Sequence, residues 1–334
     1  MTPYRSILFL GLGGAGQRHL RYLKQKFPKA RLMCHRTKKT TPVLNADFSV
    51  KSGAFLEKEN SLHNYLSLNE ALAEKPELVV ISTPTSLHAD HICRALQAGS
   101  DVFCEKPGLT NSVEYQKIKI LLEQGNNSLY VGFQRFFHPV SLALRAFIES
   151  TSRSELKSID CSVGSYFPNW HVYEDYRILY AGKKSLGGGV LRTECHELAL
   201  LISCLGQLKV YELEQYQNTG FEIDVESCIN LKGFVGETKI TAKLNFLTHK
   251  EERMITVCTD EGFRRFDYNT NQVSMSPDGQ DFYTRQEFIQ PDLFEKQMQS
   301  IFVGKNYNNN ETLNILENLS EIFELSSSSE VKNA

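Results

Sequence analysis

The chain of 334 residues lacks several features that would decide its class at once. No apolar stretch approaches the ~20 residues that cross a bilayer, so a membrane-spanning protein is not expected. The formal net charge of -2 gives no electrostatic reason to expect binding to nucleic acid or to an anionic membrane. There is no internal repeat, and low complexity is confined to a run of serines near the C-terminus. The chain is too long for one ordinary core, so we expect two domains.

The eight cysteines are scattered and include no Cys-x-x-Cys pair. This pattern excludes a disulfide framework and a zinc site of the usual spacing, and we expect no metal. It indicates reduced, mostly buried thiols in a cytoplasmic protein. Because the chain passes from Met1 almost directly into an apolar run, we expect no signal peptide.

A glycine loop follows that first apolar run, residues 7–10, which is typical of a strand buried on both faces of a parallel sheet. The spacing is Gly-x-Gly-x-x-Gly, and apolar residues at helical spacing come next. In a dinucleotide site the glycines permit the tight turn, the approach of a pyrophosphate and the packing of helix on strand. The helix N-terminus then offers N–H groups and positive potential to the phosphates. The loop residues expected to contact the cofactor are Gly11, Gly13, Gly14, Ala15 and Gly16.

The second predicted strand, residues 30–34, ends without the acidic residue that usually accepts from the ribose 2′-hydroxyl of NAD. Arg36, Thr37 and Lys38 offer cations and a hydroxyl there instead. These groups suit a 2′-phosphate, although the same residues could simply form a solvated loop. We therefore expect NADP(H) in preference to NAD(H).

Strands and helices alternate as far as residue 133, which predicts a doubly wound parallel sheet. Ligands bind beyond the carboxyl ends of the strands in such sheets, where Gly11, Thr83 and Lys106 are expected. The further predicted strands are 47–50, 78–82, 101–104 and 129–133. The predicted helices are 70–74 capped by Asn69, 87–98, and one that starts at Thr110 or Asn111.

The rhythm changes near residue 150, where strands follow one another with little helix between them. This order predicts a second, α+β domain with a mostly antiparallel sheet. The predicted strands are 156–167, 209–216, 225–231, 238–246, 253–259 and 263–268, with turns at 232–233 and 260–262. The predicted helices are 191–205, 292–302 and 310–325. We expect domains at 1–125 and 126–325 and a frayed tail at 326–334.

Lys106 follows a predicted strand and precedes Pro107, which restricts the lysine to extended backbone. A lysine held there could hydrogen-bond a substrate hydroxyl or carbonyl oxygen. The other interpretation is an ordinary surface lysine.

His196 lies in a predicted helix opened by three glycines, 187–189. Arg192 at i−4 and Thr193 at i−3 are expected on the same helix face, and all three are candidate substrate contacts. The histidine could accept a proton near neutral pH, or could be structural.

A segment just upstream combines the single tryptophan with aromatic and charged residues. Such a set suits a sugar-like or nucleotide ligand, and equally suits a domain interface. The candidate contacts are Trp170, Tyr173, Asp175, Tyr176 and Arg177.

Four motifs occur in a fixed order along nearly the whole chain: the glycine loop followed by His19, Ser82-Thr83-Pro84 followed by His88, Glu105-Lys106-Pro107, and the glycine stretch leading to His196. Together they resemble the Gfo/Idh/MocA family of NAD(P)-dependent oxidoreductases, and the later segment is similar to a branch associated with bacterial cell-surface sugars. The resemblance implies an N-terminal Rossmann domain and a C-terminal domain with a large open sheet, often used for oligomerisation. Because we expect that sheet to be hydrophobic, we also expect a homo-oligomer, either a dimer or a tetramer. Cofactor contacts are implied for Ser82, Thr83, Pro84, His88, Glu105 and Lys106.

The resemblance further implies hydride transfer between a nicotinamide and a sugar or nucleotide-sugar carbinol carbon. Lys106 matches the family's lysine that contacts substrate oxygen and cofactor, and His196 matches its acid–base histidine. Relatives carry an aspartate one turn before that histidine, where this chain has Thr193. Two alternatives therefore stay open: a cofactor-binding sensor or assembly protein that has lost catalysis, and a reductase of C=C or C=N bonds.

Overall fold

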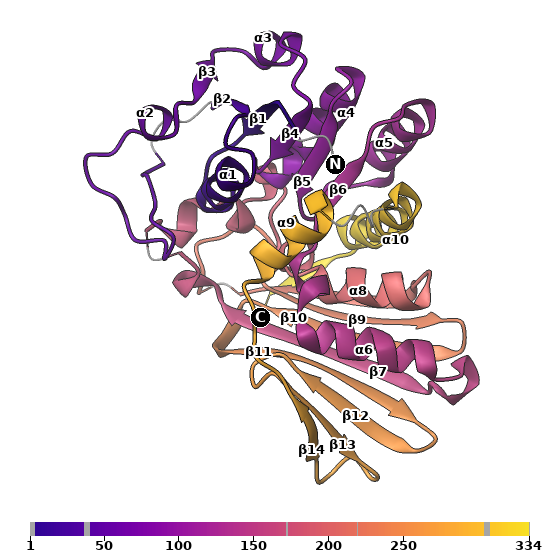
Figure 1. The fold of residues 1–334 in the computed structure, drawn as a ribbon. Helices are drawn as coiled ribbons and strands as arrows, with labels where there is room; N and C mark the ends of the chain where they lie inside the picture. Colours follow the sequence, from indigo (N-terminus) through magenta and orange to yellow (C-terminus); the bar gives the residue numbers. More distant parts are fainter. Residues whose placement is uncertain (1–3, 37–40, 172, 219, 304–307, 334) are drawn as a thin grey trace. The chain divides into compact units, whose positions relative to one another are not determined.

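The computed structural model describes residues 4–36, 41–171, 173–218, 220–303 and 308–333 (Figure 1). The chain divides into two compact units. The first combines Met1–Gly132 with Met298–Leu313, and the second combines Phe133–Gln297 with Asn314–Ala334.

The first unit contains a six-stranded, all-parallel sheet in the order β3-β2-β1-β4-β5-β6. This order confirms the predicted Rossmann sheet, with β1 at the point where the strand order reverses. The continuous apolar runs explain the central strands, because β1 and β4 are covered on both faces. The strands are β1 Ser6–Leu10, β2 Arg31–His35, β3 His63–Tyr65, β4 Leu78–Ile81, β5 Asp101–Glu105 and β6 Leu129–Gly132.

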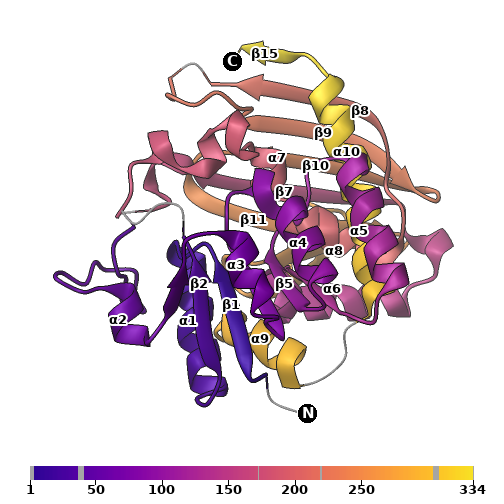
Figure 2. The same ribbon diagram turned by 90° about the horizontal axis from the view of Figure 1, so that it is seen from above.

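Helices pack on this sheet through their apolar stripes. Leu20, Leu23 and Phe27 from the first helix join one core cluster with Ile7 and Phe9 of β1. Met298, Ile301 and Phe302 contribute to the same cluster. The helices are α1 Gly14–Lys26, α2 Leu56–Asn60, α3 Leu68–Ala73, α4 His88–Gln97, α5 Ser112–Gln124 and the end of α9 Leu293–Val303. Figures 1 and 2 both show α4 and α5 side by side.

Two predictions for the first unit are wrong. Residues 47–50 form no strand, because the Asp47 side chain accepts from the Ser49 backbone N–H and Phe48 adopts a left-handed conformation. The edge strand is His63–Tyr65 instead. The cap of α3 is Ser67, which forms a capping box with Glu70, and not Asn69. Of the two predicted starts of α5, Thr110 and Asn111, the structure makes Asn111 the N-cap and begins the helix at Ser112.

The second unit contains a mixed, mostly antiparallel sheet of nine strands, as predicted, in the order β14-β13-β12-β11-β7-β10-β9-β8-β15. Among the described residues, only the pairs β7–β10 and β8–β15 of this sheet are parallel. The strands are β7 Ser158–Tyr166, β8 Lys209–Gln217, β9 Cys228–Val235, β10 Thr238–Asn245, β11 Leu247–Thr259, β12 Gly262–Asp267, β13 Gln272–Ser276, β14 Tyr283–Glu287 and β15 Val331–Asn333.

Helix α6 (Pro139–Ser150), helix α8 (His196–Leu205) and part of α10 (Asn309–Ser328) belong to this second unit. In β7, β9 and β10 buried residues alternate with more exposed ones, as expected when one face of a sheet is covered. The more exposed positions on the central strands include Asp160, Lys239 and Lys243. Polar residues therefore predominate on this face, although Tyr211 and Phe234 are also exposed, so the expected hydrophobic sheet is not observed. The predicted homo-oligomer stays a prediction.

Several local predictions for the second unit are wrong. Lys232 and Gly233 lie inside β9, and the turn is at Gly236, whose φ of 59° suits glycine. The tail is not frayed as far as it is described, since α10 reaches Ser328 and Val331–Asn333 pairs with β8. Strands β13 and β14 were not predicted from the sequence, because their short, polar patterns carry little periodicity. Helix α6 was also missed, although Val140, Leu144 and Ile148 recur at helical spacing and are buried.

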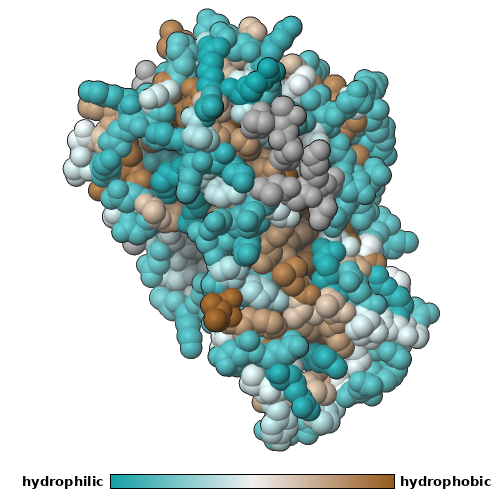
Figure 3. All heavy atoms as spheres, viewed as in Figure 1, coloured by the Kyte–Doolittle hydropathy of each residue, from teal (hydrophilic) through white to brown (hydrophobic). Residues whose placement is uncertain are grey.

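No helix among the described residues is both long and apolar enough to span a bilayer. Within the same residues no group of three or more His, Cys, Asp or Glu side chains could hold a metal ion. Figure 3 shows mainly hydrophilic residues in its view, with a more hydrophobic area over α6, where Leu142 is exposed.

Candidate active site

The glycine loop lies where the sequence predicts it, between β1 and α1. Gly11 has a φ of 80°, and a Cβ there would lie 2.5 Å from the Ser82 carbonyl oxygen. A Cβ on Gly16 would collide with the Gly11 carbonyl oxygen. Gly13, by contrast, faces open space, with no atom within 4 Å of a Cβ position, and it caps α1 without any side chain. The loop therefore leaves both room and uncapped N–H groups, which fits a dinucleotide pyrophosphate.

The end of β4 contributes Ser82, Thr83 and Pro84 to the same edge of the sheet. The buried Oγ of Ser82 has no hydrogen-bond partner within the described part of the chain. His88 lies behind this loop: its Nε2 is 2.8 Å from the Thr83 carbonyl oxygen. Burial lowers the pKa of His88 to about 4, so the neutral ring donates to that oxygen. The structure thus makes His88 a support for Thr83.

Lys106 follows β5 directly, after a buried ion pair. His19 Nε2 on α1 lies 2.6 Å from Glu105 Oε1, and the His19 ring packs edge-on against Phe103. Burial opposes ionisation of Glu105, but the hydrogen bond and charge of His19 outweigh it and lower the pKa of Glu105. This pair anchors the strand end from which half-buried Lys106 projects, before a cis peptide bond to Pro107.

Arg36 lies just past β2, as predicted, but it is not a free cation. Its Nη1 donates to Glu57 Oε1 at 2.9 Å. The other two residues predicted to hold a 2′-phosphate, Thr37 and Lys38, lie outside the described residues.

His196 lies in the second unit at the first residue of α8. The predicted helix 191–205 is in fact two helices, α7 (Val190–Thr193) and α8, because the chain breaks at Glu194 and Cys195. The break removes the predicted common face of His196 with residues 192 and 193. The ring of His196 is buried and packs edge-on against Phe133, at 6.1 Å between centroids.

Thr193 and Arg192, both predicted to contact the substrate, form hydrogen bonds with other residues of the second unit. The Thr193 hydroxyl donates to the Gly189 carbonyl oxygen at 2.7 Å, back along its own helix. The Arg192 guanidinium donates to Gly188 and Ser327 and lies over the ring of Phe323. Neither side chain supplies the negative charge that an imidazolium would favour.

The break before His196 is held by an arginine on β11. Arg253 Nη2 pairs with Glu194 Oε2 at 2.6 Å, and Arg253 Nη1 pairs with Glu197 Oε2 at 2.7 Å. The side chains of Arg253, Glu194 and Glu197 are 4, 8 and 1% exposed. Burial lowers the pKa of Arg253, but the two carboxylates outweigh it and raise that pKa well above its usual value. We name these three residues the Arg253 clamp.

The tryptophan segment reaches the same clamp. Trp170 Nε1 donates to Ser165 Oγ at 3.0 Å, and that hydroxyl donates to Glu194 Oε1 at 3.3 Å. Trp170 and Tyr176 both pack edge-on against buried Phe167. These contacts bring Trp170 close to the residues that precede His196.

The other members of that segment pair locally. Arg177 binds Asp175 at 2.6 Å, and its hydrogen bonds lower the pKa of Asp175 to about 2. The ring of Tyr173 stacks on His171. These three are exposed or half-buried, so they stay candidate ligand contacts only as predictions.

The carboxylate of Glu226 packs against the stretch of three glycines, residues 187–189. Glu226 Oε1 accepts from the Leu191 N–H at 3.2 Å, and a Cβ on Gly189 would collide with the Glu226 carboxylate. Burial raises the pKa of Glu226. A glycine is therefore needed at position 189 to make room for Glu226. This need explains Gly189 without invoking a bound substrate.

Sequence reasoning missed Glu57 in the first unit and Arg253 in the second. Neither carries a local signal, because their partners are distant in the chain. His19 and Glu105 both belong to motifs noted in the sequence, but only the structure shows that they pair with each other.

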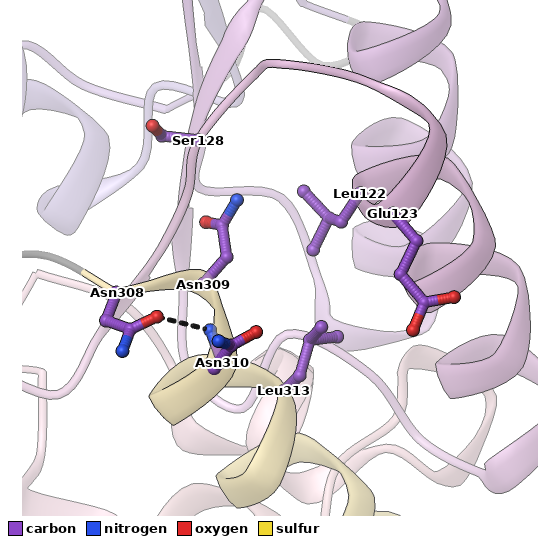
Figure 4. Close-up of a pocket in the computed structure, with 7 residues that line it drawn as sticks. All are labelled: Leu122, Glu123, Ser128, Asn308, Asn309, Asn310 and Leu313. Carbon is purple, nitrogen blue, oxygen red and sulfur yellow. Dashed lines mark hydrogen bonds between the residues drawn. The ribbon is translucent and has the colours of Figure 1, made fainter.

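One pocket of the first unit, of about 410 Å³, lies apart from this site (Figure 4). It opens between the end of α5 and the start of α10, beside Ser128, which precedes β6. The candidate site residues follow the carboxyl ends of parallel strands, so this pocket is at the opposite edge of the sheet. Its lining residues are Leu122, Glu123, Ser128, Asn308, Asn309, Asn310 and Leu313.

Comparison with known proteins matches residues 5–133 to the GFO_IDH_MocA family, described as an oxidoreductase family with an NAD-binding Rossmann fold. A curated relative, trans-1,2-dihydrobenzene-1,2-diol dehydrogenase of Xenopus tropicalis, is 26% identical over 199 residues, which cover 59% of this chain. The chain spans about half of that relative, 53% of its length.

Two solved structures have the same fold. The WlbA dehydrogenase of Bordetella pertussis, in complex with NADH and UDP-GlcNAcA, gives a TM-score of 0.74 at 18% identity over 96% of both chains. UDP-N-acetylglucosamine 3-dehydrogenase GnnA of Acidithiobacillus ferrooxidans gives a TM-score of 0.71 at 15% identity over 96% of both chains. At these identities the likeness concerns the fold alone.

Proposed function

Because this chain belongs to the Gfo/Idh/MocA oxidoreductase family, we propose that it transfers hydride between a nicotinamide dinucleotide and a sugar or nucleotide-sugar carbinol carbon. The observation that carries the proposal is the open space beside Gly13 at the uncapped start of α1, on the sheet edge that also presents Lys106. A dinucleotide bound there would rest its pyrophosphate on backbone N–H groups.

Each catalytic role follows from the chemistry of one side chain. When bound, the nicotinamide supplies the hydride acceptor for oxidation or the donor for reduction. The Lys106 ammonium donates a hydrogen bond to the substrate oxygen and stabilises negative charge there. In oxidation a ring nitrogen of His196 takes the proton from the substrate hydroxyl, and in reduction the protonated ring returns it.

The proposed cofactor is NADP(H) in preference to NAD(H). Arg36 is the described residue that supports this preference, because a guanidinium just past β2 suits a 2′-phosphate. The proposed remaining contacts are those of the loops after β1, β4 and β5: Gly11, Gly13, Gly14, Ala15, Gly16, Ser82, Thr83, Pro84 and Glu105.

Two observations support the substrate class. The WlbA dehydrogenase is in complex with UDP-GlcNAcA, and GnnA is a UDP-N-acetylglucosamine 3-dehydrogenase. In this chain, Trp170 and Tyr176 gather on Phe167 near the residues before His196 and supply the aromatic faces that sugar rings pack against. A homo-oligomer is also proposed, and light scattering would give its mass.

A second function is favoured by the surroundings of His196. Relatives carry an aspartate one turn before this histidine, whereas here Thr193 stands at that position and donates to the Gly189 carbonyl oxygen. A threonine cannot place a negative charge beside an imidazolium as a carboxylate does. The alternative is therefore a protein that binds the cofactor but senses or assembles without turnover.

One experiment separates these functions. The purified protein is titrated with NADPH and NADH by nicotinamide fluorescence, and nucleotide sugars are then added while absorbance follows the redox state. Binding with sugar-dependent turnover that His196→Asn abolishes supports the enzyme. Binding without turnover supports the sensor, and turnover only with a C=C or C=N substrate supports the reductase. The absence of binding would overturn all three.

A further inference from the structure

The position just past β2 carries a partly buried charge pair, Arg36 and Glu57. Arg36 Nη1 lies 2.9 Å from Glu57 Oε1, and the side chains are 5 and 31% exposed. Arg36 Nη2 is buried and has no hydrogen-bond partner within the described part of the chain. The guanidinium is thus nearly covered with one unused donor, while the carboxylate remains partly accessible.

Glu57 is held at this position by its helix, α2. The preceding residue, Leu56, is buried in the core cluster that includes Leu32 and Cys34 of β2. Lys24 of α1 donates to the Glu59 carbonyl oxygen and to Asn60 Oδ1 at the other end of the short helix. Because both ends of α2 are attached, Glu57 is a fixed part of the first unit.

A carboxylate and a guanidinium at this position have opposite preferences for a dinucleotide. In parallel α/β sheets an acidic residue near the end of the second strand accepts from the ribose 2′-hydroxyl of NAD, while an arginine there accommodates the 2′-phosphate of NADP. The sequence after β2 offers no acid, but the fold brings one in from 21 residues further along the chain. The guanidinium of Arg36 and the carboxylate of Glu57 therefore lie next to each other beyond the end of β2, and their opposite charges partly cancel.

We propose that Glu57 determines cofactor specificity by opposing Arg36, an inference that rests on the proposed dinucleotide binding. Glu57 accepts the 2′-hydroxyl of NAD(H) and occupies the donor that a 2′-phosphate needs. A 2′-phosphate must displace Glu57 or bind the second nitrogen beside it, and in both cases two negative charges repel. The protein accordingly binds both cofactors. The ratio of its dissociation constants for NADH and NADPH is smaller than it would be with Arg36 and no Glu57.

The test is the ratio of dissociation constants for NADH and NADPH, measured by nicotinamide fluorescence on the full chain. Glu57→Gln keeps the size of the side chain and removes the charge. NADPH is expected to bind about tenfold more tightly, because one repelling unit charge at contact distance is removed. NADH is expected to bind a few-fold more weakly, because an amide is a poorer acceptor than a carboxylate.

Glu59→Gln is the matched control. It removes the same charge from the same short helix, but Glu59 pairs with Lys51 at 2.7 Å and not with Arg36. The ratio in this variant is expected to equal that of the wild type. An equal shift in both variants would mean that only the overall charge of α2 matters, and would overturn the proposal.

Arg36→Gln gives the opposite sign. The dissociation constant for NADPH should rise about tenfold or more, because the charge-assisted hydrogen bonds to the 2′-phosphate are lost. The dissociation constant for NADH should change by no more than a few-fold. If Glu57→Gln binds both cofactors with the wild-type ratio, the role of Glu57 is overturned and the proposed function stands. If the folded wild type binds neither cofactor, the proposed function itself is overturned.

Discussion

The two units support their candidate catalytic residues in different ways. In the first unit one imidazole, His19, pairs with one carboxylate, Glu105, directly before Lys106. Both residues belong to motifs at the carboxyl edge of a parallel sheet. In the second unit a single guanidinium, Arg253, pairs with two carboxylates that flank His196. Both sites join residues that are distant in the chain: His19 and Glu105 are 86 residues apart, and Arg253 is 59 and 56 residues from Glu194 and Glu197.

The two units differ in how many carboxylates lose a partner when one side chain is removed: one in the case of His19 and two in the case of Arg253. Without His19, Glu105 still lies near the charge of Lys106. Without Arg253, two buried carboxylates lose their shared cation. The second unit should therefore be far more sensitive to its central residue, and the following variants test that contrast.

Arg253→Met should give the largest effect. Leaving two buried carboxylates without their cation is expected to lower the free energy of unfolding by about 3–5 kcal/mol. Urea denaturation followed by circular dichroism measures this loss. Lys232→Met is the control, because Lys232 pairs with Glu212 in an exposed setting and its loss should cost below about 1 kcal/mol. A similar small loss in both variants would remove the contrast between the units.

Lys106→Ala should leave folding nearly unchanged and lower turnover. Loss of one donor to a developing charge is expected to reduce kcat about 10²–10³-fold. The dissociation constant for NADPH, measured by fluorescence, should change far less, since the loop after β1 holds the pyrophosphate. Lys117→Ala, on the exposed face of α5, is the matched control. Equal losses in turnover and in cofactor binding would contradict the assigned role.

Two glycine variants in the first unit should separate folding from binding. Gly11→Ala places a Cβ 2.5 Å from a backbone oxygen at a φ of 80°, and is expected to cost about 2 kcal/mol of unfolding free energy or more. Gly13→Ala meets no atom within 4 Å, so stability should stay within about 0.5 kcal/mol. The added methyl group occupies the proposed pyrophosphate space, so NADPH should bind at least about tenfold more weakly. Unchanged NADPH binding by Gly13→Ala would place the cofactor elsewhere.

Glu226→Gln should give the smallest effect, and one that depends on pH. Burial raises the pKa of Glu226 in the folded state, so between its unfolded and folded pKa the folded protein binds more protons. Stability of the wild type is therefore lost as pH rises through that window. The variant keeps the acceptor for the Leu191 N–H and removes the titration, so its free energy of unfolding relative to the wild type should increase as pH rises through that window. Denaturation at several pH values measures this, and a parallel pH dependence in both proteins would contradict it.

Much of the first unit was predictable because its signals are local. Continuous apolar runs gave β1, β4 and β5, and the glycine spacing gave the turn into α1. The edge strand was misplaced because Asp47 and Phe48 form a turn inside an otherwise strand-like stretch. In the second unit the hairpin turn at 260–262 was correct, while the break before His196 was missed, since residues 191–205 read as one continuous helix.

By itself the sequence determined the parallel sheet, its glycine loop, the place of Lys106 after β5 and the mostly antiparallel second sheet. Only the tertiary structure decided which charges meet: Arg36 with Glu57, His19 with Glu105, and Arg253 with Glu194 and Glu197. The physical reason is range. Backbone propensity and hydrophobic periodicity act over a few residues, whereas a buried charge selects its partner among groups that the fold brings within about 3 Å.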